Sequence, residues 1–205
     1  MKASTRVRLA AFGEPLGPEV ERLYAAEIGL ESLPEWVGTL TRLRTLDIGH
    51  NLLSSLPSLA GLRELEILYV HDNRLGVLPS WIAGLPSLTY LNAAENGLEA
   101  VPALDGLTRL LELRLMHNSL TEVGPLPPSL RELHLRGNAL SAVPPSIRGL
   151  AELRVLDLRA NRLAGALPEW LAELPRLEKL DLRWNDWDDP PTWPELPARC
   201  VVLRD

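Results

Sequence analysis

The side chains of this 205-residue sequence that could do chemistry gather just before a recurring asparagine. All four histidines lie within four residues before such an asparagine: His50, His71, His117 and His134. Imidazole is the commonest metal ligand in proteins and changes charge near neutral pH. Two histidines with a carboxylate such as Asp47 or Asp72 could hold zinc. The pattern therefore raises two hypotheses, a metal site and a pH-sensitive interface.

Arginine and aromatic side chains occupy equivalent places further along the chain. The arginines are Arg114, Arg136, Arg159 and Arg183, with Met116 and Trp184 beside them. These residue types are enriched at the centres of protein interfaces. A second interpretation is that Asp157 and Asp181 neutralise the arginines in a solvated ladder that contributes little. Tyr69 and Tyr90, like Tyr24, combine an apolar ring with a polar hydroxyl and are candidate anchors for a partner.

The sequence does not favour an enzyme. Its single cysteine, Cys200, has no histidine, asparagine or aspartate positioned with it by the pattern. The motifs G-x-x-x-x-G-K-[ST], G-x-S-x-G and H-E-x-x-H are all absent. We therefore expect no catalysis, no cofactor and no bound metal.

Charge and composition limit the kinds of partner that the protein is expected to bind. The net charge of −6 and pI of about 5.3 supply no attraction for nucleic acid or anionic lipid. No apolar run approaches the roughly 18 residues of a membrane span, and the first residues lack the apolar core of a signal peptide. A lone thiol suits a reducing compartment. We expect a cytoplasmic monomer that binds neither nucleic acid nor membrane.

The elements that position these side chains are repeats of the pattern L-x-L-x-x-N. The matches are LDIGHN, LYVHDN, LNAAEN, LRLMHN, LHLRGN, LDLRAN and LDLRWN, which end at Asn51, Asn73, Asn96, Asn118, Asn138, Asn161 and Asn185. An eighth, atypical unit runs from Leu23 to Leu30. The intervals of 20 to 24 residues lie in the range of leucine-rich repeats.

Each unit predicts one turn of a solenoid. The period of two in L-x-L places both leucines on one face of a short strand, and the strands stack in parallel on the concave side. Segments such as residues 79–88 predict short helices or 3₁₀ turns on the convex side. The asparagines are expected to pair backbone groups of adjacent turns.

The ends of the solenoid are expected to be capped. At the N-terminus, Val7 and Leu9 predict an edge strand, and Gly17 with Pro18 predicts a helical turn. After Asn185, Trp187, Trp193 and Leu196 are expected to cover the last core layer, while residues 200–203, with a buried Cys200, add a strand. The single domain 1–205 thus divides into an N-terminal cap (1–22), repeats (23–185) and a C-terminal cap (186–205).

The segment LPEWLAELPRLEKLDLRWN, residues 167–185, resembles leucine-rich repeats of the typical 23-residue class, found in Ras-group plant and animal proteins and in many bacterial ones. The resemblance covers residues 23–185. PPSLRELHLRGN, residues 127–138, resembles instead the shorter units of bacterial secreted effectors. The resemblance implies an α/β horseshoe of about eight repeats that binds other proteins without doing chemistry.

The repeat assigns a set of side chains to the free, concave face. We expect a protein or peptide partner to be bound by Tyr69, His71, Tyr90, Asn92, Arg114, Met116, His134, Arg136, Asp157, Arg159, Arg183 and Trp184. The main hypothesis is an intracellular adaptor or regulator. The alternatives are a bacterial effector, a recognition module of a larger system, and a metal-binding or pH-sensing scaffold. The excess of arginine over lysine is typical of GC-rich bacterial genomes.

Overall fold

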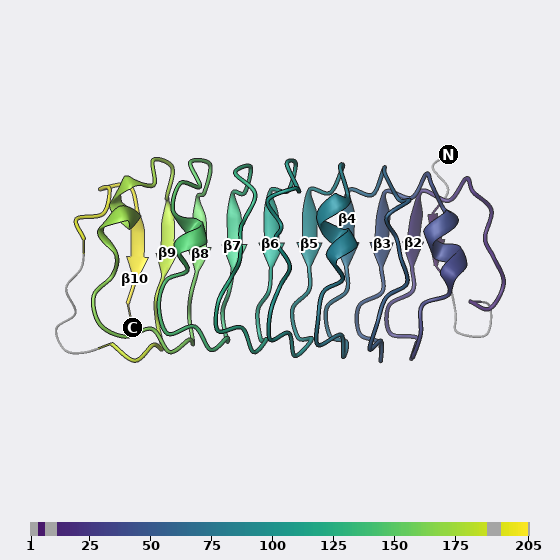
Figure 1. Cartoon of the computed structure of the whole chain (residues 1–205), viewed down its shortest axis with the longest axis horizontal. Helices are drawn as coiled ribbons and strands as arrows, with labels where there is room; N and C mark the ends of the chain where they lie inside the picture. The colour runs from purple at the N-terminus through teal and green to yellow at the C-terminus, as the bar shows by residue number, and fades with distance from the viewer. Residues whose placement is uncertain (1–3, 7–11, 188–193, 205) are drawn as a thin grey trace.

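The computed structural model describes residues 4–6, 12–187 and 194–204, and its repeats follow one another as turns of a solenoid (Figure 1). Within them the sheet has ten strands: β1 Ser4–Arg6, β2 Arg22–Tyr24, β3 Thr45–Asp47, β4 Ile67–Tyr69, β5 Tyr90–Asn92, β6 Glu112–Arg114, β7 Glu132–His134, β8 Val155–Asp157, β9 Lys179–Asp181 and β10 Val201–Leu203. Neighbouring strands are parallel and lie in chain order, so the two termini are at opposite ends.

The register follows the leucines. The first leucine of each L-x-L pairs with its equivalent in the next repeat, as Leu46 pairs with Leu68 and Leu68 with Leu91. These central leucines have no exposed surface. Burying each one stabilises the stack by roughly 1.5–3 kcal/mol relative to leaving it exposed. The residues on either side of it point to the open face of the sheet, which is the concave face expected from the sequence.

Short 3₁₀ helices lie opposite the sheet in four of the repeats, as predicted for the convex side. They are η2 Glu35–Thr39, η3 Ser80–Gly84, η4 Pro145–Ile147 and η5 Glu169–Glu173. Each follows a proline, whose fixed φ suits entry into a helical turn. Trp36, Trp81 and Trp170 in these helices pack half-buried against the core. Their common place in the repeat is therefore structural, as expected.

The predicted asparagine ladder is confirmed. In all seven repeats from Asn51 to Asn185, the Nδ2 group donates to two or three backbone carbonyls and Oδ1 accepts from a backbone N–H. Asn118, for example, donates to the carbonyls of Ala93 and Leu115 and accepts from the N–H groups of Asn96 and Leu98. Each asparagine thus ties its own turn to the preceding repeat.

Both ends of the solenoid carry strands outside the repeats. β1 pairs with β2, although it begins earlier than predicted, and Val7 and Leu9 lie outside the described residues. Gly17 accepts a hydrogen bond from Val20 in a turn. At the other end, β10 pairs with β9 close to the predicted place, and Trp187 packs against the core. Trp193 lies outside the described residues.

Two further features concern the burial of the cysteine and the character of the helices. Cys200 is half-buried rather than fully enclosed, and both Cys200 and Leu196 pack against the core. Among the described residues, no helix has the length and apolar character needed to cross a bilayer.

Candidate functional site

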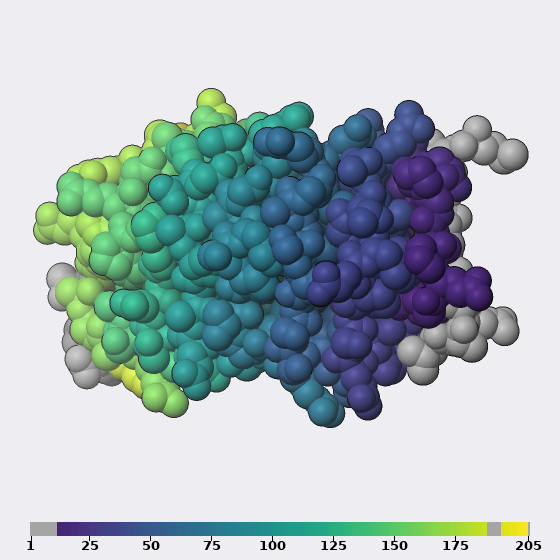
Figure 2. Space-filling view, turned by 45° about the vertical axis from the view of Figure 1, so that its right-hand side comes forward, coloured from purple at the N-terminus to yellow at the C-terminus, as the bar shows by residue number. Residues whose placement is uncertain are grey.

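The open face carries the candidate residues in register. One row of paired residues crosses the strands from β3 to β9. It consists of Asp47, Tyr69, Asn92, Arg114, His134, Asp157 and Asp181. Because these residues are paired on adjacent strands, their side chains are close enough to interact across the sheet. On the surface of the molecule, successive repeats form adjoining bands (Figure 2).

A tyrosine–arginine cluster, formed by Tyr69, Tyr90 and Arg114, occupies the centre of this face. The rings of Tyr69 and Tyr90 lie 5.0 Å apart between centroids, and the Arg114 guanidinium lies 5.7 Å from the Tyr90 centroid. Burial raises the pKa of Tyr90 to about 12, so its hydroxyl keeps its proton. Two of the three predicted tyrosine anchors, Tyr69 and Tyr90, thus form one packed group with Arg114.

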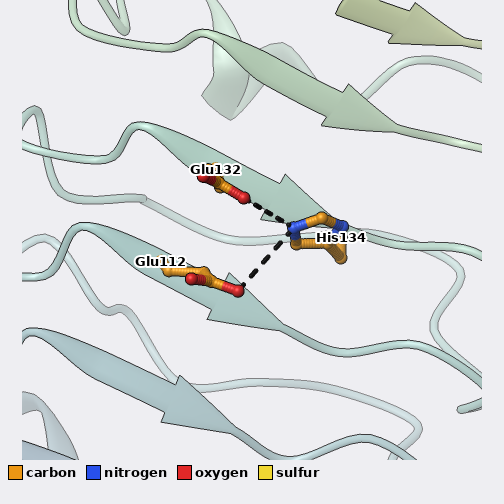
Figure 3. Close-up of side chains that lie close together, drawn as sticks. All are labelled: Glu112, Glu132 and His134. Carbon is orange, nitrogen blue, oxygen red and sulfur yellow. Dashed lines mark hydrogen bonds and ion pairs between the residues drawn. The ribbon is translucent and has the colours of Figure 1, made fainter.

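Arg114 contacts a group of two carboxylates and one imidazole, Glu112, Glu132 and His134, which the sequence analysis missed. Its Nε donates to Glu112 Oε1 at 2.5 Å. His134 Nε2 lies 3.3 Å from Glu132 Oε2 and 3.9 Å from Glu112 Oε1 (Figure 3). One ligand atom from each of Glu112, Glu132 and His134 lies within 4.8 Å of the others, a geometry that could admit a metal ion. Because Arg114 already neutralises Glu112, a cation would compete with the guanidinium here.

The position of the two glutamates in the repeat could have indicated this group. Glu112 and Glu132 each stand one place before the first leucine of consecutive repeats, a column left out of the sequence interpretation. His117, another of the four histidines, lies apart from this group, against Gly137. An added Cβ at Gly137 would be 2.6 Å from His117 Nδ1.

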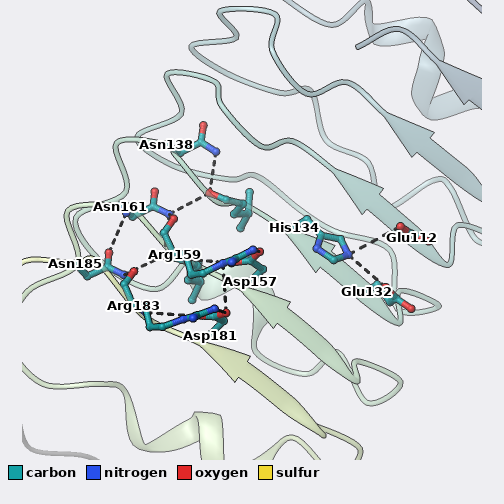
Figure 4. A network of polar contacts seen from close by, with 12 residues as sticks. Glu112, Glu132, His134, Asn138, Asp157, Arg159, Asn161, Asp181, Arg183 and Asn185 are labelled. Carbon is teal, nitrogen blue, oxygen red and sulfur yellow. Dashed lines mark hydrogen bonds and ion pairs between the residues drawn. The ribbon is translucent and has the colours of Figure 1, made fainter. Parts of the chain in front are cut away.

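The C-terminal arginines are held by buried carboxylates (Figure 4). Arg159 donates from Nε and Nη2 to Asp157 at 2.9 and 2.7 Å, and its Nε lies 3.3 Å from Asp181 Oδ2. Arg183 makes the same two-pronged contact with Asp181, at 2.9 and 2.7 Å. Burial alone would raise the pKa of Asp181, but the bonds from Arg183 and the charge of Arg159 outweigh it and hold that pKa below its usual value.

This geometry sharpens the ladder interpretation of the arginine row. The ion pairs expected from the sequence are present, but Asp157 and Asp181 are buried rather than solvated. Asn92, which was placed on the binding face with Asp157, is also buried, and its Oδ1 accepts from the N–H of Ala94. With exposed fractions of 8% for Asn92 and 6% for Asp157, both side chains organise the face and offer a partner little surface.

An arginine–tryptophan cluster, formed by Arg136, Arg183 and Trp184, lies at the C-terminal end of the face. Both guanidiniums lie over the Trp184 ring, at 5.8 Å for Arg136 and 5.5 Å for Arg183. Trp184 is 59% exposed, and the buried Nε of Arg136 has no hydrogen-bond partner. This cluster therefore offers a partner an exposed indole ring, which the buried ion pairs do not.

Between the two clusters the face is hollowed. The hollow has a volume of about 240 Å³ and is lined by Arg114, Met116, His134 and Arg159, among others. Its lining joins the Met116 thioether to arginine side chains and to the carboxylates of Asp157 and Asp181 that pair with Arg159, so it suits a partner side chain that is partly apolar and partly polar.

A histidine pair lies toward the N-terminal end of the face. His50 and His71 approach each other with their Nε2 atoms 3.2 Å apart, and His50 Nδ1 lies 2.6 Å from Asp72 Oδ2. The hydrogen bond to Asp72 raises the pKa of His50, whereas burial and the neighbouring His50 lower that of His71. The two histidines occupy different columns of the repeat, yet their side chains converge.

Comparison with known proteins agrees with the repeat pattern. The family profile described as leucine rich repeat matches residues 32–75 and 128–186, which together make up half of the sequence. The chain is a leucine-rich repeat protein. The expected solenoid of stacked L-x-L strands is accordingly both its fold and its family.

Its relatives have diverse names. Leucine-rich repeat-containing protein 58 of Homo sapiens is 38% identical over 104 residues, 46% of this chain and 26% of the relative. Lumican of Oryctolagus cuniculus is 38% identical over 97 residues, 46% of this chain and 49% of the relative. The matched part of this leucine-rich repeat protein thus spans a quarter to a half of these relatives.

Solved structures match over more of the chain. The leucine-rich effector protein YopM from Yersinia pestis is 31% identical with a TM-score of 0.78, over 92% of this chain and 49% of YopM. The ectodomain of the receptor kinase GASSHO1/SCHENGEN3 from Arabidopsis thaliana, in complex with CASPARIAN STRIP INTEGRITY FACTOR 2, is 32% identical with a TM-score of 0.69, over 84% of this chain and 23% of the other. A leucine-rich repeat protein of Leptospira interrogans is 27% identical with a TM-score of 0.67, over 91% and 54%.

Proposed function

We propose that this leucine-rich repeat protein is a non-catalytic module that binds a protein or peptide on its open face. The observation that carries the proposal is the pair of aromatic–arginine clusters on one rigid sheet, with the hollow between them. Aromatic and arginine side chains dominate the binding energy of protein interfaces because they bury large areas and still form polar contacts.

The spacing of the clusters suits an extended segment that crosses the strands. Tyr90 lies on β5 and Trp184 follows β9, four strand steps further along. At about 4.8 Å per step the two anchors are separated by roughly 19 Å across the strands, and the offset of Trp184 beyond the end of its strand adds to this, so a segment that joins them needs more than about six extended residues. The GASSHO1/SCHENGEN3 ectodomain, a protein of the same family, was solved with a bound partner, which supports a binding role.

The chemistry of the thiol supports a non-catalytic role. Burial raises the pKa of Cys200, whereas a nucleophilic cysteine needs a lowered pKa so that the thiolate forms. We also propose the cytoplasm as the working compartment, because the one cysteine of the sequence allows no internal disulfide.

The experiment is a selection of binding peptides from a random displayed library, followed by affinity measurements on variants. We expect Tyr90→Ala and Trp184→Ala each to weaken the selected peptides by about 30-fold, which corresponds to about 2 kcal/mol per anchor. Val77→Ala is the matched control, since Val77 is 66% exposed in the loop after β4. Peptides that tolerate both open-face variants but lose affinity with Val77→Ala would refute the proposed surface.

A bacterial effector is the second candidate. The 20-residue interval between Asn118 and Asn138, and the similarity to YopM over 92% of this chain, favour it. Fusion of the full chain to a translocation reporter tests this candidate. Delivery of the reporter into host cells by a secreting bacterium would support an effector, and retention in the bacterium would contradict it.

A further inference from the structure

The Nε2 atoms of the histidine pair, His50 and His71, lie 3.2 Å apart, a separation close to that of two ligands on one metal ion. In a tetrahedral zinc site, two bonds of about 2.0–2.1 Å at the tetrahedral angle place the nitrogens about 3.3 Å apart. The rings meet edge to face, at an interplanar angle of 80° and 4.6 Å between centroids. A metal ion between the two Nε2 atoms would take the place of the proton that one of them donates to the other in this contact.

Gly49 provides the space that brings His71 to this position. A Cβ added at Gly49 would lie 2.5 Å from His71 Cε1 and 2.8 Å from its Nδ1, so the imidazole lies directly on the glycine. The Nδ1 atom is buried there without a hydrogen-bond partner. Nε2 is consequently the ring nitrogen of His71 that faces a neighbour, and it faces His50.

His50 has the surroundings of a metal-ligating histidine. Its Nδ1 donates to Asp72, which fixes the tautomer that leaves a lone pair on Nε2, and ligating histidines commonly have such a carboxylate partner. The side chain of His50 is 46% exposed, so an ion can enter from solvent and keep water on its remaining positions. The carboxylates of Glu27 and Glu95 act on His50, and that of Asp47 acts on His71, all favouring a cation.

We propose that His50 and His71 form a site for a zinc-class divalent ion, bound through their two Nε2 atoms, with Asp72 orienting His50. The coordination positions left open face the solvent on the same side as the partner-binding surface. Imidazole selects zinc, copper and nickel over magnesium and calcium. The sequence places His50 and His71 at different positions of their repeats, and the space at Gly49 is what lets the two side chains meet.

The test is titration of the full chain with zinc chloride by isothermal calorimetry, with ¹⁵N spectra of the imidazoles to identify the ligating nitrogens. We expect one ion to bind and the Nε2 resonances of His50 and His71 to shift. His50→Gln and His71→Gln should each weaken binding at least tenfold. Asp72→Asn should weaken it about 10–100-fold, the usual effect of losing such a carboxylate.

Two variants separate this site from its rivals. His117→Gln is the matched control and should leave the zinc affinity unchanged. His134→Gln removes the imidazole beside Glu112 and Glu132, and it should also leave the affinity unchanged. Absence of saturable binding to the wild type, or loss of binding in His134→Gln with retention in His71→Gln, would overturn the proposal. His50→Gln changes an exposed side chain, so it decides the matter even where His71→Gln fails to fold.

Discussion

Removal of one asparagine from the ladder tests how the repeats are joined. Asn118→Ala deletes the acceptor for the N–H groups of Asn96 and Leu98, both 3.0 Å from Oδ1, and the donor to the carbonyl of Ala93 at 3.1 Å. Leu115 keeps a bond from Asn138, so its carbonyl stays satisfied. Two orphaned, buried N–H groups at about 1–3 kcal/mol each predict a loss of about 2–6 kcal/mol in the free energy of unfolding.

The assay is urea denaturation followed by circular dichroism, with the midpoint and slope fitted for each variant. Asn185→Ala is the matched control, because Asn185 makes equivalent bonds but is only half-buried, so water can replace part of what is lost. We expect a clearly smaller loss there. An Asn118→Ala midpoint equal to that of the wild type, or a larger loss at Asn185, would refute the reasoning.

Three further changes probe the buried charges and the core. Asp181→Asn should lower the free energy of unfolding by about 1.5–3 kcal/mol at pH 7. Because the pKa of Asp181 in the folded protein lies below 3.8, its stabilising contribution is present above that pH and is lost as the pH falls through the folded pKa. The melting temperatures of the wild type and of Asp181→Asn should therefore converge in acid. Arg159→Ala should cost about 1.5–3 kcal/mol, because it leaves the buried Asp157 without its guanidinium; a loss below 0.5 kcal/mol would mean that the pair is solvated. Leu113→Ala should cost about 2–5 kcal/mol by urea denaturation, and a loss typical of a surface site would contradict the core register.

The fold was predictable because its signals are local and repeated. The L-x-L step fixes which residues are buried, and a spacing of 20 to 24 residues aligns each leucine with its equivalent in the next turn. Asn118 and its equivalents could be assigned a backbone-pairing role because they follow each strand from β3 to β9 at the same place. The sequence by itself therefore determined the solenoid, its leucine register and the residues of the open face.

Only the tertiary structure decided how the side chains on that face are partnered. Sequence spacing could not show that Asp157 is buried under Arg159, or that Glu132 faces His134. Nor could it show that Gly49 lets His71 reach His50, since this depends on side-chain rotamers and on the contact between neighbouring turns. The physical reason is that the repeat specifies backbone and burial through many equivalent contacts, whereas each polar pair depends on one local arrangement.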